Sequence, residues 1–303
     1  MSTSKMRAPV ISDIGHVAVR VRDLDAAEHL ATHLMGLRVT ERTDDSVWLT
    51  HGTDHHSLHY TRDTIDAVDH VGLVAAGPES VEEIKSRVTA AGLQVIADGP
   101  DGPGPEDGFM FQDEEGFAFQ IYSQMTKVED PIDRLVLRPR RLGHVNFFAS
   151  DAPRMQKMLI DVLDFRISDY ANPGGMFLRC NADHHGIGVF PGPGQLHHHA
   201  WEYPTIVELA ELADYVDSHG HSTLWGPMRH GIGRNIATYV REPSGLVAEF
   251  YCDMDQIRDD ASHVPGQWDI ENGHKWVSLW AEHYTPEGFA DMGLPPVALA
   301  AAK

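Results

Sequence analysis

The alternation of apolar and polar residues near the start of the chain predicts one strand, then one helix, then further strands. Residues 16–22 alternate as a strand with one buried face does. Residues 24–36 carry apolar side chains at helical spacing and end in a glycine, which favours a helix end there. Residues 46–52 and 55–62 are typical of strands, and a turn containing glycine joins them. The pattern indicates a βαβββ unit.

The same order of elements returns further along the chain. A strand opens at Asp69, and residues 79–92 favour a helix that ends in a glycine. Residues 108–122 predict a hairpin whose turn carries Gly116. We therefore expect two βαβββ units before the middle of the chain.

Segments of the first half recur in the second half in the same order, at a nearly constant offset of about 128 residues. The pairs include IGHVAVRVRD with LGHVNFFASD, and EEGFAFQIY with PSGLVAEFY. Such an ordered series is not expected by chance, and the offset is too long for a solenoid repeat. The sequence predicts an α+β protein with two tandem duplicated modules of paired βαβββ units. We place the modules at 10–124 and 138–253, a linker at 125–137 and a tail at 254–303.

Composition and charge narrow the classes of function. The 303 residues are 42% hydrophobic and 23% charged, which is typical of a globular protein with a sizeable core. The formal net charge of −21 makes binding to nucleic acid or to an anionic membrane surface unfavourable. The chain has no run of apolar residues long enough for a membrane span, no apolar signal segment at its start, and only two cysteines. We expect a cytoplasmic protein.

Three strand positions of the second module, and their equivalents in the first, carry residues suited to binding a metal. They are His144, His198 and Glu249 in the second module, and His16, His70 and Gln120 in the first. Two imidazoles and one carboxylate hold a divalent metal and leave positions open, as in non-haem Fe(II) oxygenases. A carboxylate alone in an apolar strand, as Glu249 would be, is costly unless a cation compensates it. Because an amide replaces the acid in the first module, we expect that site to bind metal more weakly and interpret it as vestigial.

Three segments of the second module together resemble a known family. Residues 229–251, RHGIGRNIATYVREPSGLVAEFY, place His230, Tyr239 and Glu249 in the order found in type I extradiol ring-cleaving dioxygenases of the vicinal oxygen chelate superfamily. The segments HGIGVFPGPGQLHHHA and GHVNFF are similar to the family's two histidine ligand strands. The His-x-Asn pattern of the last segment resembles the branch of catechol and homoprotocatechuate 2,3-dioxygenases in particular.

The resemblance implies a fold and a reaction. Each module would form a cupped mixed sheet around a cavity. The ligands His144, His198 and Glu249 would hold Fe(II), with Mn(II) as the alternative. The reaction would be extradiol cleavage of a catechol by O₂ to a product of the 2-hydroxymuconic semialdehyde type, in aromatic catabolism. The resemblance also implies a homo-oligomer, a dimer or a tetramer.

The resemblance further implies roles for residues around the metal. His185 would be the acid–base group, and its neighbour His184 is the less favoured candidate. His230 and Tyr239 would donate hydrogen bonds to the catechol oxygens. Asn146 lies two residues after a ligand on the same strand, so alternation places it on the same face, within reach of a bound ligand.

Histidines beside the ligands are expected to have other roles. His197 and His199 flank ligand His198, so strict alternation sends them to the opposite face, where they would pack or face solvent. His55 and His59 belong to the degenerate module, and we expect no metal there. The aromatic tail would form a lid over the site or a subunit contact.

The substrate contacts depart from the resembled branch. Trp225 stands where that branch has an arginine that pairs with the substrate carboxylate, and Phe177 stands where it tends to have tryptophan. A catechol with an uncharged or apolar substituent is therefore expected. Another cation could replace the missing arginine, and Arg229, Arg234 and Lys275 are the candidates, with Arg229 included among the substrate-binding residues.

Two other classes of function compete with the dioxygenase. A glyoxalase-type isomerase or thiol transferase generally takes ligands, including two carboxylates, from both modules, whereas Gln120 replaces the acid here. A drug-sequestering protein of the same fold has no need for Glu249 together with His185 and Tyr239. We therefore favour the extradiol dioxygenase.

Overall fold

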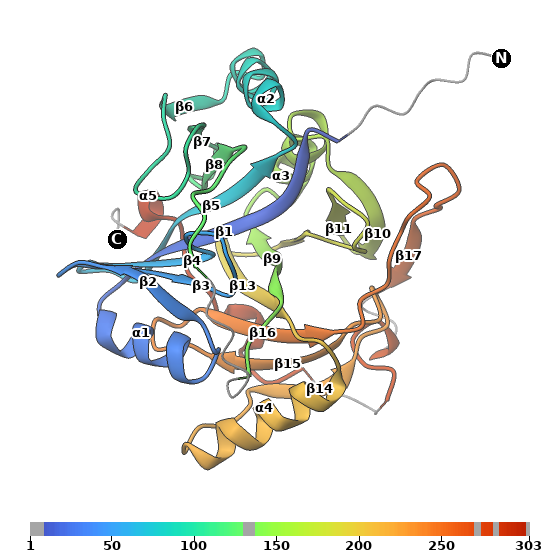
Figure 1. Cartoon of the computed structure of the whole chain (residues 1–303). Coiled ribbons are helices and arrows are strands. Elements are labelled where there is room, and N and C mark those ends of the chain that lie inside the picture. Colours follow the sequence, from blue (N-terminus) through green and yellow to red (C-terminus); the bar gives the residue numbers. More distant parts are fainter. Residues whose placement is uncertain (1–8, 130–136, 270–273, 281–284, 301–303) are drawn as a thin grey trace.

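The chain forms two mixed β-sheets that lie against each other (Figure 1). The structure, a computed structural model, describes residues 9–129, 137–269, 274–280 and 285–300. Strands β1 to β8 form the first sheet and strands β9 to β17 form the second. Two mixed sheets with helices between some of their strands agree with the α+β class that the sequence predicts.

The first sheet has eight strands in the order β2-β3-β4-β1-β5-β8-β7-β6. Its strands are β1 (Ile11–Val21), β2 (Arg38–Arg42), β3 (Ser46–Thr50), β4 (Leu58–Arg62), β5 (Ala67–Ala75), β6 (Gln94–Ala97), β7 (Phe109–Gln112) and β8 (Ala118–Tyr122). Its helices are α1 (Leu24–His33) and α2 (Pro78–Ala90).

The second sheet has nine strands in the order β14-β15-β16-β13-β9-β12-β11-β10-β17. Its strands are β9 (Arg141–Ala149), β10 (Arg166–Asn172), β11 (Gly175–Arg179), β12 (Ile187–Pro191), β13 (Gln195–Glu202), β14 (Trp225–Arg229), β15 (Ile236–Arg241), β16 (Val247–Cys252) and β17 (Gly266–Asp269). Its helices are α3 (Ala152–Asp161) and α4 (Ile206–Ser218).

Each sheet is two βαβββ units joined through their first strands. In the first sheet β1 pairs antiparallel with β5, and in the second β9 pairs antiparallel with β13. Within every unit the last strand returns parallel to the first, a connection that requires a crossover such as the helix each unit contains. The tandem duplication predicted from the repeated segments is confirmed by this shared topology.

The repeated segments also explain where the helices begin. Asp23 and Asp151 end the two copies of the first repeated segment, and each caps the following helix by accepting a backbone N–H bond, from Ala26 in α1 and from Arg154 in α3. Helix α1 ends at His33, before the glycine expected to stop it. Gly36 instead forms the next turn, with φ of 73° and no room for a side chain beside the Leu137 carbonyl.

The two modules share one apolar core. One cluster of buried apolar residues extends through both sheets, and the Phe117 and Phe147 rings meet edge to face across the modules at 5.0 Å. Polar contacts cross the same boundary, since Tyr203 donates to the Met35 carbonyl and Tyr60 to the Glu242 carboxylate. The second module is therefore rigidly backed by the first.

The segment predicted as a linker begins inside the first module. Thr126 and Val128 donate backbone bonds to Gly104 and Thr53, so residues 125–128 lie against the first module. Residues 130–136 of the expected linker lie outside the described residues.

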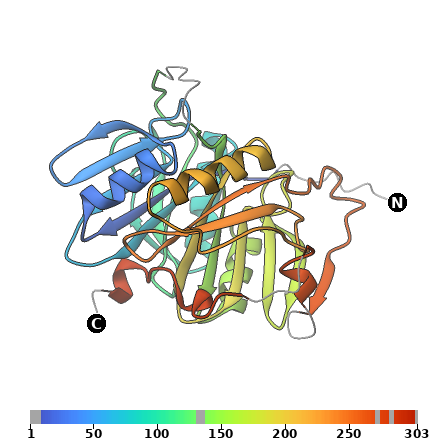
Figure 2. The same cartoon turned by 90° about the horizontal axis from the view of Figure 1, so that it is seen from below.

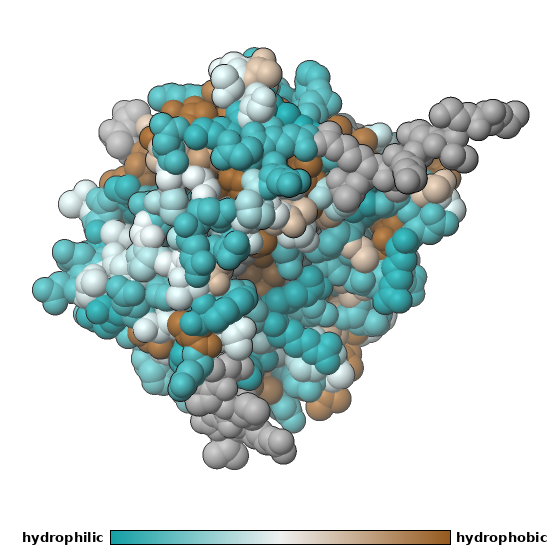
Figure 3. Space-filling view, turned by 45° about the horizontal axis from the view of Figure 1, so that its top comes forward, coloured by the Kyte–Doolittle hydropathy of each residue, from teal (hydrophilic) through white to brown (hydrophobic). Residues whose placement is uncertain are grey.

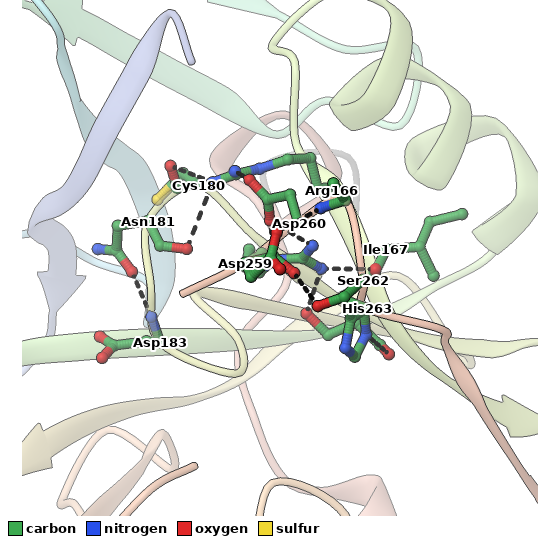
Figure 4. A network of polar contacts seen from close by, with 12 residues as sticks. Arg166, Ile167, Cys180, Asn181, Asp183, Asp259, Asp260, Ser262 and His263 are labelled. Atoms are coloured by element: carbon green, nitrogen blue, oxygen red, sulfur yellow. Dashed lines mark hydrogen bonds and ion pairs between the residues drawn. The ribbon is translucent and has the colours of Figure 1, made fainter. Parts of the chain in front are cut away.

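The tail is fastened to the second module before it crosses to the first. Asp260 pairs with Arg166 and Arg179, and His263 bonds the Ser168 carbonyl at 2.8 Å, which ties the tail to β10 and β11 (Figure 4). Strand β17 then extends the sheet beside β10. Figure 2 shows the described residues after β17 lying along one side of the molecule, as far as the short helix α5 (Val297–Ala300) beside the first module.

One face of the molecule is largely polar. On the face in Figure 3, hydrophilic residues predominate and hydrophobic ones are scattered between them, in keeping with the strong negative net charge. Within the described residues, no helix has the length and apolar character needed to cross a membrane.

Candidate metal centre

A cavity of about 370 Å³ lies within the second module and under the tail. Aromatic side chains provide most of its apolar wall, and they are Phe148, Phe177, Phe190, Trp225, Trp276 and Phe289. Its polar residues include His144, Asn146, His185, His197, His198, His230, Asn235, Tyr239 and Glu249. The cavity thus contains the three expected ligands and all four residues expected to act beside them.

The three expected ligands converge from three neighbouring strands. Ala200 on β13 pairs with His144 on β9 and with Glu249 on β16, which puts both side chains on one face of the sheet at the same level. The Oε2 atom of Glu249 lies 3.3 Å from Nε2 of His144 and 3.2 Å from Nε2 of His198. All three side chains are buried.

The electrostatics of this cluster fit a divalent cation. Burial alone would raise the pKa of Glu249, but the charge and hydrogen bond of His144, with contributions from His230 and Tyr239, lower it. Burial lowers the pKa of His198 well below its usual range, so that imidazole is neutral. An ionised carboxylate therefore sits buried beside the Nε2 atoms of both histidines, and the neutral imidazole of His198 can donate a lone pair. A ligand set of two imidazole nitrogens and one carboxylate oxygen suits Fe(II) or Mn(II).

The orientation of ligand His198 is controlled by its neighbour. His197 Nε2 lies 2.8 Å from the Phe289 carbonyl, which can only accept, so this nitrogen carries the proton. Nδ1 of His197 must then accept from Nδ1 of His198, at 2.6 Å. The proton of His198 is thereby held on Nδ1, and its Nε2 presents a lone pair to the metal position.

The expectation that His197 faces away from the cavity is wrong. The pairing of β13 with β9 shifts register between Leu196 and His198, so the bulge breaks the alternation at His197. His199 does face the opposite side, where it is fully buried, pairs with Glu242 and accepts from Trp201 Nε1 at 2.7 Å. Its role is packing between the modules, as expected.

His185 stands directly beside a ligand. Its ring centre is 4.5 Å from that of His144 and 4.7 Å from that of Phe177. Burial, together with the nearby histidines, lowers the pKa of His185 well below its usual range, so the ring is neutral.

A second pair of residues supports His185 from behind. His184 Nε2 lies 3.3 Å from the Asp169 carboxylate, which fixes a proton on that nitrogen. His184 Nδ1 then accepts from Nδ1 of His185, at 3.0 Å. This arrangement leaves Nε2 of His185 as the nitrogen able to take a proton. Sequence reasoning did not find Asp169, because it lies on β10, far from the motif.

His230 and Tyr239 form a hydrogen-bonded pair in the cavity wall. His230 Nδ1 donates to the Val277 carbonyl at 2.6 Å, so its Nε2 accepts from the Tyr239 hydroxyl at 2.8 Å. Trp225 stacks on Tyr239 with ring centres 5.5 Å apart. Both polar groups reach the cavity, as the motif predicts.

The expected substrate contacts are only partly at the cavity. Trp225 and Phe177 line it, but Arg229 does not: its guanidinium binds Asp253 at 2.7 Å and the Arg234 carbonyl at 2.6 Å. The side chain leaves β14 on the side away from the cavity. Among the described residues, the cavity lining contains no lysine or arginine, so Arg234 and Lys275 are not there either.

The tail contributes residues that the motifs did not identify. Trp276, Val277, Thr285, Phe289 and Ala290 line the cavity, so the tail covers the site. The concentration of aromatic residues after position 266 was the only sequence signal for this.

Comparison with known proteins places the chain in a family. The sequence profile of the Glyoxalase/Bleomycin resistance protein/Dioxygenase superfamily matches residues 13–121 and again residues 141–250. The chain belongs to this superfamily. The two matches fall on the two sheets, which agrees with the duplication.

Individual relatives in the superfamily include ring-cleaving dioxygenases. The chain is 27% identical to a metapyrocatechase of Geobacillus stearothermophilus, covering 88% of this chain and 90% of the relative. It is 28% identical to a manganese-dependent 2,3-dihydroxybiphenyl 1,2-dioxygenase of Geobacillus genomosp. 3, covering 92% of each. The resemblance deduced from the motifs is thereby confirmed.

Solved structures share the fold over nearly the whole chain. A Mn(II)-bound glyoxalase of Novosphingobium aromaticivorans has a TM-score of 0.86 at 26% identity, covering 95% of each chain. Homoprotocatechuate 2,3-dioxygenase of Arthrobacter globiformis has a TM-score of 0.88 at 22% identity, covering 99% of this chain and 97% of the other. At that identity the second likeness establishes the fold.

Proposed function

We propose that this protein is an extradiol dioxygenase that cleaves a catechol with O₂ at a single Fe(II) or Mn(II) ion held by His144, His198 and Glu249. The observation that carries the proposal is the convergence of these three side chains in a cavity that also contains His185 and Tyr239. Relatives named as metapyrocatechase and as dihydroxybiphenyl dioxygenase support it. The product would be of the 2-hydroxymuconic semialdehyde type, formed in aromatic catabolism.

The three ligands divide the work of holding the metal. Glu249 supplies the negative charge and is itself fixed by Asn235, whose amide donates to its second oxygen at 2.9 Å. When bound, the metal supplies Lewis acidity and adjacent open positions for the substrate oxygens and O₂. His197 keeps the ligand nitrogen of His198 free of a proton.

His185 moves the substrate proton. A catechol must lose a proton on binding, and Nε2 of His185 is the basic nitrogen on the ring nearest ligand His144. The hydrogen bond from its Nδ1 to His184, which is held in turn by Asp169, stabilises the ring in that tautomer and would stabilise its charged form. The same nitrogen can return the proton later in the reaction.

The remaining side chains bind and orient the ring. The Tyr239 hydroxyl and His230 Nε2 can exchange their mutual bond for bonds to a substrate oxygen. Asn146 also lines the cavity. The aromatic wall and the covering tail exclude water, which strengthens these polar contacts.

The substrate we propose is a catechol with an uncharged or apolar substituent. Trp225 and Phe177 offer ring faces, and no cation from the described residues lines the cavity to compensate a carboxylate. A carboxylate brought into this space would have no lysine or arginine among the described residues to pair with.

The decisive experiment is anaerobic reconstitution with Fe(II) or Mn(II), followed by O₂ uptake and the appearance of a yellow ring-opened product from substituted catechols. Glu249→Gln should abolish uptake, while Glu211→Gln, an exposed change of the same chemistry on α4, should leave it intact. Full uptake in Glu249→Gln would refute the proposal.

A glyoxalase-type reaction is the second candidate, because one structural relative is named a glyoxalase. If the protein consumes the thiol adduct of an α-oxoaldehyde in the absence of O₂, as monitored by absorbance, that result would favour the glyoxalase-type reaction over ring cleavage. The single carboxylate among the ligands, with Gln120 at the equivalent position of the first module, favours the dioxygenase.

We also propose the division into modules at 10–124 and 138–253, a homo-oligomer of two or four chains, and a cytoplasmic location. Matches of the superfamily profile at 13–121 and 141–250 support the division. Light scattering on a sizing column tests the assembly, and cell fractionation tests the location.

A further inference from the structure

The first module keeps a second group of buried histidines at positions equivalent to the metal site. His16 and His70 occupy the strand positions of the two histidine ligands, and both are buried. Their Nε2 atoms lie 2.9 Å apart and share a hydrogen bond, which a metal ion bound by both nitrogens would replace. Two imidazole nitrogens that converge in this way can share one metal ion.

The surroundings of these histidines also repeat those of the metal site. The ring centres of His16 and His56 are 4.6 Å apart at 59°, against 4.5 Å and 59° for His144 and His185. His56 is backed by His55, with Nδ1 atoms 3.1 Å apart, and His55 by the Glu41 carboxylate at 3.3 Å. The carboxylate–His–His series is thus present in both modules.

His70 is held as a ligand histidine would be. Its Nδ1 lies 2.8 Å from Asp69 Oδ1, and a carboxylate fixes the proton on that nitrogen. Arg20 holds the other oxygen of Asp69 at 2.6 Å. Nε2 of His70 is therefore left with a lone pair directed at His16.

Gln120 completes the group with an unused oxygen. Gly72 pairs with His16 on one side and with Gln120 on the other, so the two side chains lie on one face at the same level. Gly72 leaves room for the His16 ring, which lies 2.1 Å from where its Cβ would be. The Gln120 amide donates to the Asp101 carbonyl at 3.4 Å, while its buried Oε1 has no hydrogen-bond partner.

We propose that His16, His70 and Gln120 form a second metal site, which takes a borderline divalent cation such as Zn²⁺ and has a structural role. Neutral imidazoles suit Zn²⁺, whereas Fe(II) and Mn(II) gain more from the carboxylate that is missing here. Met110 pairs with Gln120, where Tyr239 pairs with Glu249, so the first module lacks the hydroxyl donor of the catalytic cavity. A metal here would join β1, β5 and β8 without turning over substrate.

The test must separate this site from adventitious zinc at the surface. His29 and His33 are exposed on α1, with ring centres 4.1 Å apart, and form a surface chelating pair. The experiment therefore uses His29→Ala/His33→Ala protein, stripped of metal, equilibrated with Zn²⁺ and separated from free ion. We expect mass spectrometry to find two Zn²⁺ per chain in this protein. We expect one Zn²⁺ per chain in a variant that also carries His16→Ala and His70→Ala. Two in both proteins would overturn the proposal.

Two further measurements keep the test independent of folding and of the dioxygenase activity. Crystals of the zinc-equilibrated His29→Ala/His33→Ala protein, measured at the zinc absorption edge, should show an anomalous peak between His16 and His70. Absence of this peak would overturn the proposal even if the variant with His16→Ala and His70→Ala fails to fold. Gln120→Glu restores the carboxylate, so Mn(II) affinity at this site should rise by at least about tenfold. An unchanged affinity would argue that Gln120 faces no metal.

Discussion

The replacement of His197 by phenylalanine isolates the contribution of a residue that touches no metal. Phenylalanine keeps the ring and its contacts with Phe148 and Phe289, whose ring centres lie 5.1 and 4.6 Å away. It removes the acceptor for Nδ1 of His198 and the donor to the Phe289 carbonyl. Packing is thus nearly constant while two buried hydrogen bonds disappear.

The expected loss of metal affinity can be worked out from the hydrogen-bond donor that is left without a partner. A buried donor without a partner costs about 1–3 kcal/mol. In His197→Phe, His198 can relieve this cost by moving its proton from Nδ1 to Nε2, which is the nitrogen that must bind the metal. Metal affinity should therefore fall by about 10–100-fold, or about 1.4–2.8 kcal/mol.

The assay is anaerobic competition for Fe(II) or Mn(II) between protein and a coloured chelator, with turnover then measured at saturating metal. The matched control is His199→Phe, on the other side of the same ligand. Because His199 pairs with buried Glu242 and not with a ligand, this change should lower the melting temperature and leave the metal affinity of the folded protein unchanged. If His197→Phe binds metal as tightly as the unaltered protein, the proposed orientation of His198 is refuted.

Three further predictions concern the catalytic cavity. Glu249→Gln should lose metal retention and O₂ uptake together, since the only charged ligand is gone; metal analysis after desalting checks this, and retained uptake would contradict it. His185→Phe should keep its metal but turn over about 10²–10⁴-fold more slowly if it moves the proton; loss of metal would instead make it a ligand. On the iron-loaded enzyme, kcat/KM should be higher for 4-methylcatechol than for homoprotocatechuate, and the reverse order would show that Trp225 does not exclude the carboxylate.

The duplication in the sequence made it possible to predict the overall fold and the positions of the metal ligands. Strand alternation and the constant offset placed His144, Asn146 and Glu249 on one face, and the sheet register bears this out. The ends of helices were harder to predict from the sequence. Gly36, for example, lies in the turn that follows α1 and is not the residue at which the helix ends.

Other features depend on contacts that no local pattern reveals. The side of the sheet that His197 faces is decided by a bulge in the pairing with β9, which is a tertiary event. Arg229 was assigned to the cavity from its place in the motif, yet Asp253 and the Arg234 carbonyl hold it outside. Phe289 lies far along the chain from the histidine it supports, and Asp169 lies on a different strand from His184, so only the folded structure joins them.

The path of the tail has a consequence for the order in which the protein matures. Phe289 supplies both a wall of the cavity and the carbonyl that holds His197, and Leu294 pairs with Leu196 on β13 through two backbone bonds of 2.9 Å. These residues follow both sheets in the chain and are therefore synthesised after them. A nascent chain can therefore build both sheets, but it cannot present a finished ligand set until residues 289–294 have been synthesised. Acquisition of the metal should accordingly follow the synthesis of this segment, and shortening the chain before residue 289 should yield a protein that holds its metal poorly.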